Sequence, residues 1–104
     1  MSRFITSPDL VEKDKHTVTL IDPSADDIER VGLYCATLET DYDIYLYNGS
    51  WGDLQYLQEL SNRSDKVLIS SASQVNISGS ENVEQYGPTR PLTSPLEYFQ
   101  SLNG

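Results

Sequence analysis

Four polar positions in this chain stand where reactive groups can meet. Asp22, Asn48 and Ser71 each follow a short apolar run, and Arg90-Pro91 precedes a strongly capped helix. If the runs are parallel strands, their carboxyl ends share one edge of a sheet, which is where open α/β folds place their sites. Magnesium is usually held by carboxylates and phosphate oxygens, and Asp22 is the one carboxylate of this set. The pattern therefore predicts a site position but no metal.

The apolar runs that must position these groups are short and rich in β-branched residues. The clearest are residues 17–21, which stop before a proline, residues 43–48 and residues 66–72. Proline cannot donate to a strand ladder, so the first run must end there. The run 43–48 is apolar or aromatic on both faces, which is typical of a strand covered on both sides, and we expect it to be the central strand. A short last strand is expected around residues 85–86.

Helices are expected between and after these strands. Ser24, with Asp27 three residues later, makes a capping box before an apolar stripe. Ser50 is expected to cap a second helix, and Ser94-Pro95 with Glu97 is the clearest helix start in the sequence. The residues expected to face the core are Leu54, Leu57 and Leu60 in the second helix and Leu96, Phe99 and Leu102 in the third.

Strands that alternate with helices at this spacing indicate an α/β fold. We expect a three-layer, flavodoxin-like arrangement with a short, mostly parallel sheet of about four strands. No repeat or linker divides residues 16–104, which are expected to form one domain. Residues 1–15 show no pattern that predicts a core element, so they are expected to be a loosely attached arm.

The chain is acidic, with 16 Asp and Glu against 7 Lys and Arg and a net charge of −9. This charge disfavours nucleic acid and anionic membranes as direct partners and suits a basic protein partner. The alternative interpretation is that acidity only keeps a small protein in solution. No apolar run reaches the roughly 20 residues of a bilayer span and no secretion signal is apparent, so we expect a cytoplasmic protein.

Cys35 and His16 are the only residues of their types. They allow neither a disulfide framework nor a metal-ligand cluster, and no cofactor is expected. Cys35 lies on the apolar stripe of the first helix, with no His or Lys nearby in sequence to lower its thiol pKa. We therefore expect it to fill the core and not to act as a nucleophile.

Taken in order, the strand ends resemble the receiver domain of two-component response regulators over about residues 17–103. In that family an acidic pair closes the first strand, and the aspartate that accepts the phosphoryl group closes the strand taken here as central. A Ser or Thr followed by Ala closes the next strand, and Lys-Pro follows the last. The matching segments here are Leu20-Ile21-Asp22-Pro23-Ser24, Asp43-Ile44-Tyr45-Leu46-Tyr47-Asn48, Val67-Leu68-Ile69-Ser70-Ser71-Ala72 and Arg90-Pro91.

The departures from that family matter as much as the matches. Asp22 alone remains of the acidic pair, Asn48 replaces the acceptor aspartate, and Arg90 replaces the lysine. A neutral amide cannot attack phosphorus to form a phosphoaspartate, so the resemblance implies a receiver that is not phosphorylated on aspartate. Arg90 is expected to form a permanent ion pair with Asp22. One strand–helix unit is expected to be missing between Leu38 and Asp43.

The same residues also have ordinary structural interpretations. Asn48 before Gly49 is a common turn dipeptide, Asp22 can bridge a strand and a helix cap, and Ser71 can satisfy a local backbone group. In receivers, partners dock on the surface built by the last strand and the helices, and Tyr is favoured at interfaces. The residues expected to bind a partner are therefore Tyr86, Arg90, Tyr98 and Phe99.

The expected function is that of a non-catalytic pseudo-receiver that binds another protein as a regulatory adaptor. The partner would be a basic protein or a component of signalling or transcription, and a homodimer is compatible with the same surface. The alternative is an acidic decoy that occupies a basic or nucleic-acid-binding protein. An enzyme is not expected, because no His, Cys or carboxylate pair supports catalysis at the sheet edge.

Overall fold

Strands and helices alternate along the described part of the chain. The computed structural model describes residues 3–5, 16–49, 54–75 and 81–103. Within these ranges the elements are, in order, β1 (Arg3–Ile5), β2 (His16–Ile21), α1 (Ala25–Cys35), β3 (Tyr42–Tyr47), α2 (Leu54–Arg63), β4 (Lys66–Ser70), β5 (Val83–Tyr86) and α3 (Pro95–Asn103).

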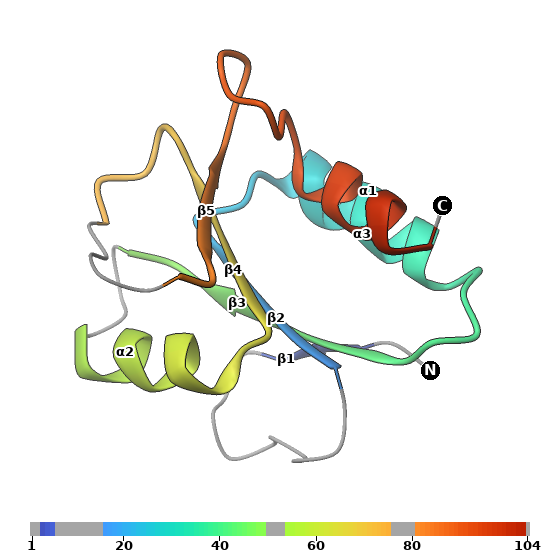
Figure 1. Ribbon diagram of the computed structural model, residues 1–104, viewed down its shortest axis with the longest axis horizontal. Coiled ribbons are helices and arrows are strands. Elements are labelled where there is room, and N and C mark those ends of the chain that lie inside the picture. The colour runs from blue at the N-terminus through green and yellow to red at the C-terminus, as the bar shows by residue number, and fades with distance from the viewer. Residues whose placement is uncertain (1–2, 6–15, 50–53, 76–80, 104) are drawn as a thin grey trace.

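The five described strands form one sheet in which every neighbouring pair is parallel. Its order is β1-β3-β2-β4-β5 (Figure 1). The part β3-β2-β4-β5 has the same order as the first four strands of a flavodoxin-like sheet. The strand β1 is added outside β3. The predicted α/β class and flavodoxin-like arrangement are confirmed, with one strand more than the about four expected from the sequence.

Helices cover both faces of the sheet and give the molecule three layers. α1 and α3 lie side by side on one face, and α2 lies on the other (Figure 1). Successive side chains of a strand point to opposite faces, so each strand contributes to both layers of core. Along β3, Ile44 packs with the α1–α3 layer, whereas Tyr45 and Tyr47 pack with the α2 layer. This two-sided burial explains the continuous apolar runs in the sequence.

The central strand is β2, whose residues from Thr17 to Ile21 are all buried. The prediction that the run ending at Asn48 would be central is therefore wrong, because β3 lies between β2 and β1. The chain leaves β2 through α1 to reach β3 and returns through α2 to β4, on the far side of β2. Since α1 and α2 cover opposite faces, the point where the connections change direction falls between β2 and β4.

The predicted start of α1 is confirmed. The Ser24 hydroxyl accepts from the Asp27 N–H at 3.1 Å, and the Asp27 carboxylate accepts from the Ser24 N–H at 3.4 Å, which completes the capping box. In α2, Leu57 and Leu60 face the core as predicted. The expected Ser50 cap and the side chain of Leu54 lie outside what the structure describes.

The start and the inner face of α3 differ in part from expectation. The helix begins at Pro95 as predicted, but the Glu97 carboxylate accepts from the amide and hydroxyl of Thr93 and not from the expected cap residue. Phe99 is fully buried, whereas Leu102 in the last turn is 53% exposed. The inner face of α3 therefore ends one turn earlier than its apolar spacing predicted.

The first residues of the chain contribute a strand, although residues 1–15 were expected to form a loosely attached arm without a core element. β1 pairs in parallel register with β3, and its Ile5 is buried in the α2 layer. A strand of three residues is too short to show an alternating pattern in a sequence. Most of the expected arm, at residues 1–2 and 6–15, lies outside the described residues.

An ion pair joins β1 to β3. The register places Arg3 opposite Asp43, with Arg3 Nε 3.0 Å from Asp43 Oδ1 and Arg3 Nη2 3.5 Å from Asp43 Oδ2. The Asp43 side chain is fully buried, and that of Arg3 is 38% exposed. A buried carboxylate that loses its charge partner is strongly destabilising, so this contact helps to hold the edge strand in place.

Replacing Arg3 by alanine is expected to lower the free energy of unfolding by about 2 kcal/mol, because the buried Asp43 carboxylate loses its partner. The matched control is Arg30→Ala, which removes an exposed ion pair with Asp26 within α1. That change is expected to cost about 0.5 kcal/mol or less. Denaturant unfolding followed by circular dichroism measures both losses. Equal losses in the two variants would contradict a special role of the buried pair.

Candidate functional site

The carboxyl ends of the strands meet at the edge where open α/β sheets form their sites. Asp22 follows β2 with a φ of 52°, in the left-handed region that few residues other than Gly, Asn and Asp adopt. Its N–H donates to the Tyr47 carbonyl at 2.8 Å, which extends the pairing of β2 with β3 by one bond. Backbone strain at this one position turns the chain out of the sheet toward α1.

The Asp22 carboxylate connects the ends of three adjacent strands. Its Oδ1 accepts from the Gly49 N–H at 2.8 Å, and its Oδ2 accepts from the Ser73 hydroxyl at 2.6 Å. Gly49 follows β3, and Ser73 follows β4. Ser73 is held in turn, because its N–H donates to the Ser70 carbonyl at 3.0 Å and its hydroxyl accepts from the Val75 N–H at 3.1 Å. Both carboxylate oxygens are thus engaged inside the fold.

Two glycines allow the strand ends to approach so closely. A Cβ at Gly49 would lie 2.5 Å from Val75 Cγ2 and 3.1 Å from Asp22 Oδ2. A Cβ at Gly87, directly after β5, would overlap the Ser71 hydroxyl. A side chain added at either position would therefore force the side chain of Val75 or Ser71 to shift.

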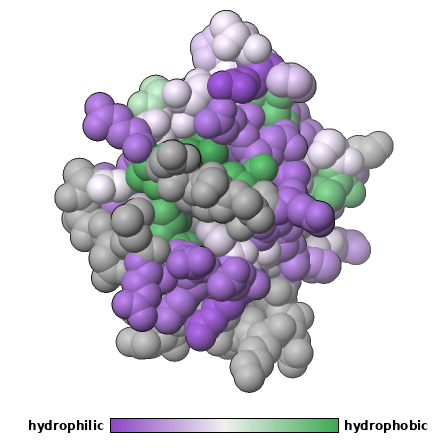
Figure 2. All heavy atoms as spheres, turned by 60° about the vertical axis from the view of Figure 1, so that its left-hand side comes forward, coloured by the Kyte–Doolittle hydropathy of each residue, from purple (hydrophilic) through white to green (hydrophobic). Residues whose placement is uncertain are grey.

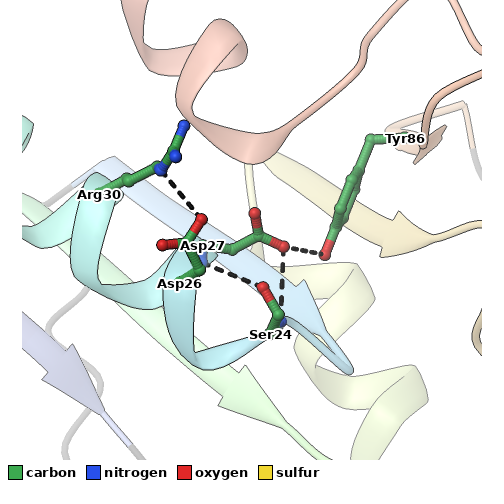
Figure 3. Close-up of polar contacts among 5 residues, drawn as sticks. All are labelled: Ser24, Asp26, Asp27, Arg30 and Tyr86. Carbon is green, nitrogen blue, oxygen red and sulfur yellow. Dashed lines mark hydrogen bonds and ion pairs between the residues drawn. The ribbon is translucent and has the colours of Figure 1, made fainter.

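A second carboxylate, that of Asp27, connects α1 to β5 (Figure 3). It accepts from the Tyr86 hydroxyl at 3.3 Å in addition to its capping bond with Ser24. Tyr86 is buried, and burial followed by the negative charge of Asp27 raises the pKa of its hydroxyl well above the usual value. A hydrogen bond with the Ser70 side chain acts in the opposite direction on that pKa. Asp22 therefore joins the ends of β2, β3 and β4, and Asp27 joins the first turn of α1 to the end of β5.

Three predicted site residues follow strand ends as expected: Asp22 after β2, Asn48 after β3 and Ser71 after β4. Their surroundings differ. The Asp22 side chain joins the strand ends, whereas Asn48 and Ser71 are exposed. The Ser71 backbone continues the pairing of β4 with β5 by donating to the Tyr86 carbonyl at 2.9 Å.

The predicted ion pair between Arg90 and Asp22 is not formed. Both residues belong to the described part of the chain, and no ion pair there joins them. The Asp22 carboxylate is held by Gly49 and Ser73 instead. Arg90 and Pro91 are exposed in the loop between β5 and α3.

Two of the four residues predicted to bind a partner are unavailable to one. Tyr86 is 4% exposed and Phe99 is 0% exposed, because both face the core between the sheet and the α1–α3 layer. Tyr98 is half-buried and lies under Lys66 Nζ, which is 5.9 Å from the ring centroid. Arg90 is the member of this set that is exposed. Tyr86 and Phe99 therefore belong to the core, and the binding of a partner by Arg90 and Tyr98 stays a prediction.

Other side chains with reactive groups do not converge in the described residues. No group of three or more His, Cys, Asp or Glu side chains is placed there to hold a metal ion. Cys35 is buried in the core as predicted, and burial raises the pKa of its thiol to about 11. None of the described helices is both long and apolar enough to cross a bilayer.

The sequence did not indicate the roles of Ser73, Gly49 and Gly87. Ser73 lies in a polar stretch without periodicity, where any of several hydroxyls could have met Asp22. A usable signal was the position of each glycine within two residues of a strand end, since a glycine leaves room for a neighbouring segment to approach closely. Comparison with protein-family models, curated proteins and solved structures gives no match for this chain.

Gly87→Ala is expected to lower the free energy of unfolding by about 1 to 3 kcal/mol, because the new methyl group overlaps the Ser71 hydroxyl. Adding Ser71→Gly removes the obstructing side chain and is expected to recover most of that loss, relative to Ser71→Gly alone. Thermal and denaturant unfolding measure the four proteins of this cycle. A loss that Ser71→Gly does not relieve would show that the close approach is not its cause.

Stability is expected to fall at high pH because buried groups keep their protons in the folded state. Burial, with the charge of Asp43 adding to it, raises the pKa of Tyr45 from 10.0 to about 12. The buried Tyr45 hydroxyl has no hydrogen-bond partner in the described structure. Below pH 10.0 both states hold the proton, whereas above it the unfolded chain ionises first and the free energy of unfolding decreases.

The free energy of unfolding as a function of pH, in the wild type and in Tyr45→Phe, measures this effect. The variant is expected to lose less stability between pH 10.0 and about 12, because phenylalanine does not ionise. Cys35, whose pKa is raised in the same direction, contributes equally to both proteins. Identical slopes would contradict the contribution of Tyr45.

Proposed function

We propose that this chain is a non-catalytic, receiver-like protein that acts by binding another protein. The observation that carries the proposal is the engagement of Asp22, whose two carboxylate oxygens accept from Gly49 and Ser73. These bonds tie each oxygen to a neighbouring strand end, so fewer lone pairs of this carboxylate remain for a metal ion. A cytoplasmic location is part of the same proposal.

The described residues at the ends of β3 and β4 support it further, because neither Asn48 nor Ser71 is a carboxylate that could accept a phosphoryl group. The receiver resemblance aligns the acceptor with Asn48, and the order of the sheet places the end of β4, at Ser70 and Ser71, next to Asp22 across the switch point. An amide or a hydroxyl cannot form a phosphoaspartate at either place. His16, the only histidine of the chain, begins β2 at the opposite edge of the sheet and cannot activate a serine at this one.

The exposed side of α1 and α3 is the surface that we assign to a partner. Leu33 of α1 is 66% exposed and Leu102 of α3 is 53% exposed. On α1, Asp26 and Glu29 are exposed on the same helix side as Leu33. Apolar side chains beside carboxylates suit a partner that presents apolar and basic residues together.

Treatment with acetyl phosphate and magnesium is expected to leave the mass of the protein unchanged, because neither candidate position can form an acyl phosphate. A receiver domain with its acceptor aspartate serves as the positive control under the same conditions. A stable phosphoryl adduct on this chain would contradict the non-catalytic part of the proposal.

The binding part is tested by co-purification from native extracts with wild type, Leu33→Asp and Gln100→Asp. Gln100 is an exposed residue of α3, and its replacement adds the same charge without removing an apolar side chain. Partners recovered by the wild type and by Gln100→Asp are expected to be lost with Leu33→Asp. Equal recovery with all three proteins would contradict this surface.

An acidic decoy remains a second candidate, and the pairing of basic residues favours it. Arg3, Arg30 and Lys66 each pair with an acidic neighbour, so much of the positive charge in the described chain is neutralised internally. Hydrophilic residues also cover much of the side shown in Figure 2. A decoy would bind basic partners with an affinity that falls steeply as salt rises through the physiological range. Binding that salt does not change would exclude it.

A further inference from the structure

The turn after β3 contains the pair Asn48-Gly49, whose chemistry the proposed function does not use. In such a pair the backbone nitrogen of the glycine can attack Cγ of the asparagine side chain, since glycine has no Cβ to obstruct the approach. Asn48 and Gly49 are both exposed, so water reaches them. The nitrogen that would attack is the one whose proton is donated to Asp22 Oδ1 at 2.8 Å.

We propose that Asn48 is a self-modification site, converted through a cyclic imide to aspartate or isoaspartate, and that the Asp22 carboxylate holds it unconverted in the folded protein. In the first step a bond forms between Gly49 N and Asn48 Cγ, and the bond from Cγ to Nδ2 breaks. Nδ2 leaves as ammonia and takes up the proton lost by Gly49 N. Water then opens the imide at one of its two carbonyls, so the net reaction consumes one water and releases one ammonia, with no oxidation or reduction.

The Asp22 contact opposes the first step in two ways. The attack requires Gly49 N to lose its proton, and an anionic nitrogen facing a carboxylate is disfavoured by like charge. The nitrogen must also turn onto Cγ, which breaks a hydrogen bond to a charged acceptor. Asp22 cannot easily withdraw, because Ser73 holds its other oxygen at 2.6 Å.

Conversion would change the strand end that Asp22 organises. The product carries a new carboxylate one residue before the Gly49 amide, and an isoaspartate adds a methylene to the main chain. An isoaspartate shifts the Gly49 N–H relative to the Asp22 carboxylate that accepts from it, and an aspartate adds a second negative charge one residue from that contact. The conversion of Asn48 is thus a slow, irreversible reaction that follows any loss of the contact between Asp22 and Gly49.

The test follows Asn48 by peptide mapping and mass spectrometry during mildly alkaline incubation of folded wild type, Asp22→Ala and Ser73→Ala. Conversion raises the mass of the peptide by about one dalton. Asp22→Ala is expected to convert Asn48 about tenfold to a hundredfold faster than the wild type, the range given by a hydrogen bond to a charged group. Ser73→Ala keeps the bond to Gly49 and is expected to accelerate the reaction far less.

Asn62, in α2 before Arg63, is the internal control and is expected to stay unchanged in all three proteins. Conversion of Asn48 in folded wild type at the rate of the urea-unfolded chain would overturn the proposal, as would equal rates in wild type and folded Asp22→Ala.

If Asp22→Ala does not fold, hydrogen exchange of the Gly49 amide in the wild type decides the question, since base-catalysed exchange removes the same proton. Exchange at least about tenfold slower than in an unstructured peptide of the same sequence supports the proposal, and unprotected exchange overturns it.

Discussion

The fold depends most on one charged hydrogen-bond acceptor at the end of its central strand. The Asp22 carboxylate receives the Gly49 amide and the Ser73 hydroxyl, and so fixes the ends of β3 and β4 on either side of β2. Hydrogen bonds to an ionised group are among the stronger ones in proteins, and this pair acts where the connections of the sheet change direction. The left-handed φ of Asp22 and the lack of a side chain at Gly49 both follow from that requirement.

Acidic side chains hold the carboxyl edge of the sheet and its outer strand β1 by different kinds of contact. At the carboxyl edge, the carboxylates of Asp22 and Asp27 accept from hydroxyl and amide donors. The bonds of Asp22 hold the ends of β3 and β4 beside the end of β2, and the bond of Asp27 holds α1 to β5. At the outer strand, the buried Asp43 meets the charged Arg3, which fastens β1 to β3. Acidic side chains thus form hydrogen bonds and ion pairs that hold neighbouring elements together, which gives part of the chain's acidity a structural role.

The sequence predicted the parts of the fold that rest on local residue types and spacing. The three longest strands, the capping box of Ser24 and Asp27 and the core position of Cys35 could be predicted because local spacing determines them. The strand β1 could not, because three residues show no period. The role of Tyr86 was missed for another reason, since its hydroxyl meets Asp27 only after β5 and α1 are brought together by the fold. Likewise, Ser73 and not Arg90 meets Asp22, a choice made by the path of the loop after β4.

The central claim is that the Asp22 carboxylate works inside the fold, and a double-mutant cycle tests it most directly. Free energies of unfolding for wild type, Asp22→Ala, Ser73→Ala and the double variant give the coupling between the two side chains. We predict a coupling of about 1.5 to 3 kcal/mol, the range for a hydrogen bond to a charged group. A coupling near zero would mean that the Ser73 bond to Asp22 contributes nothing to stability, and it would contradict this account.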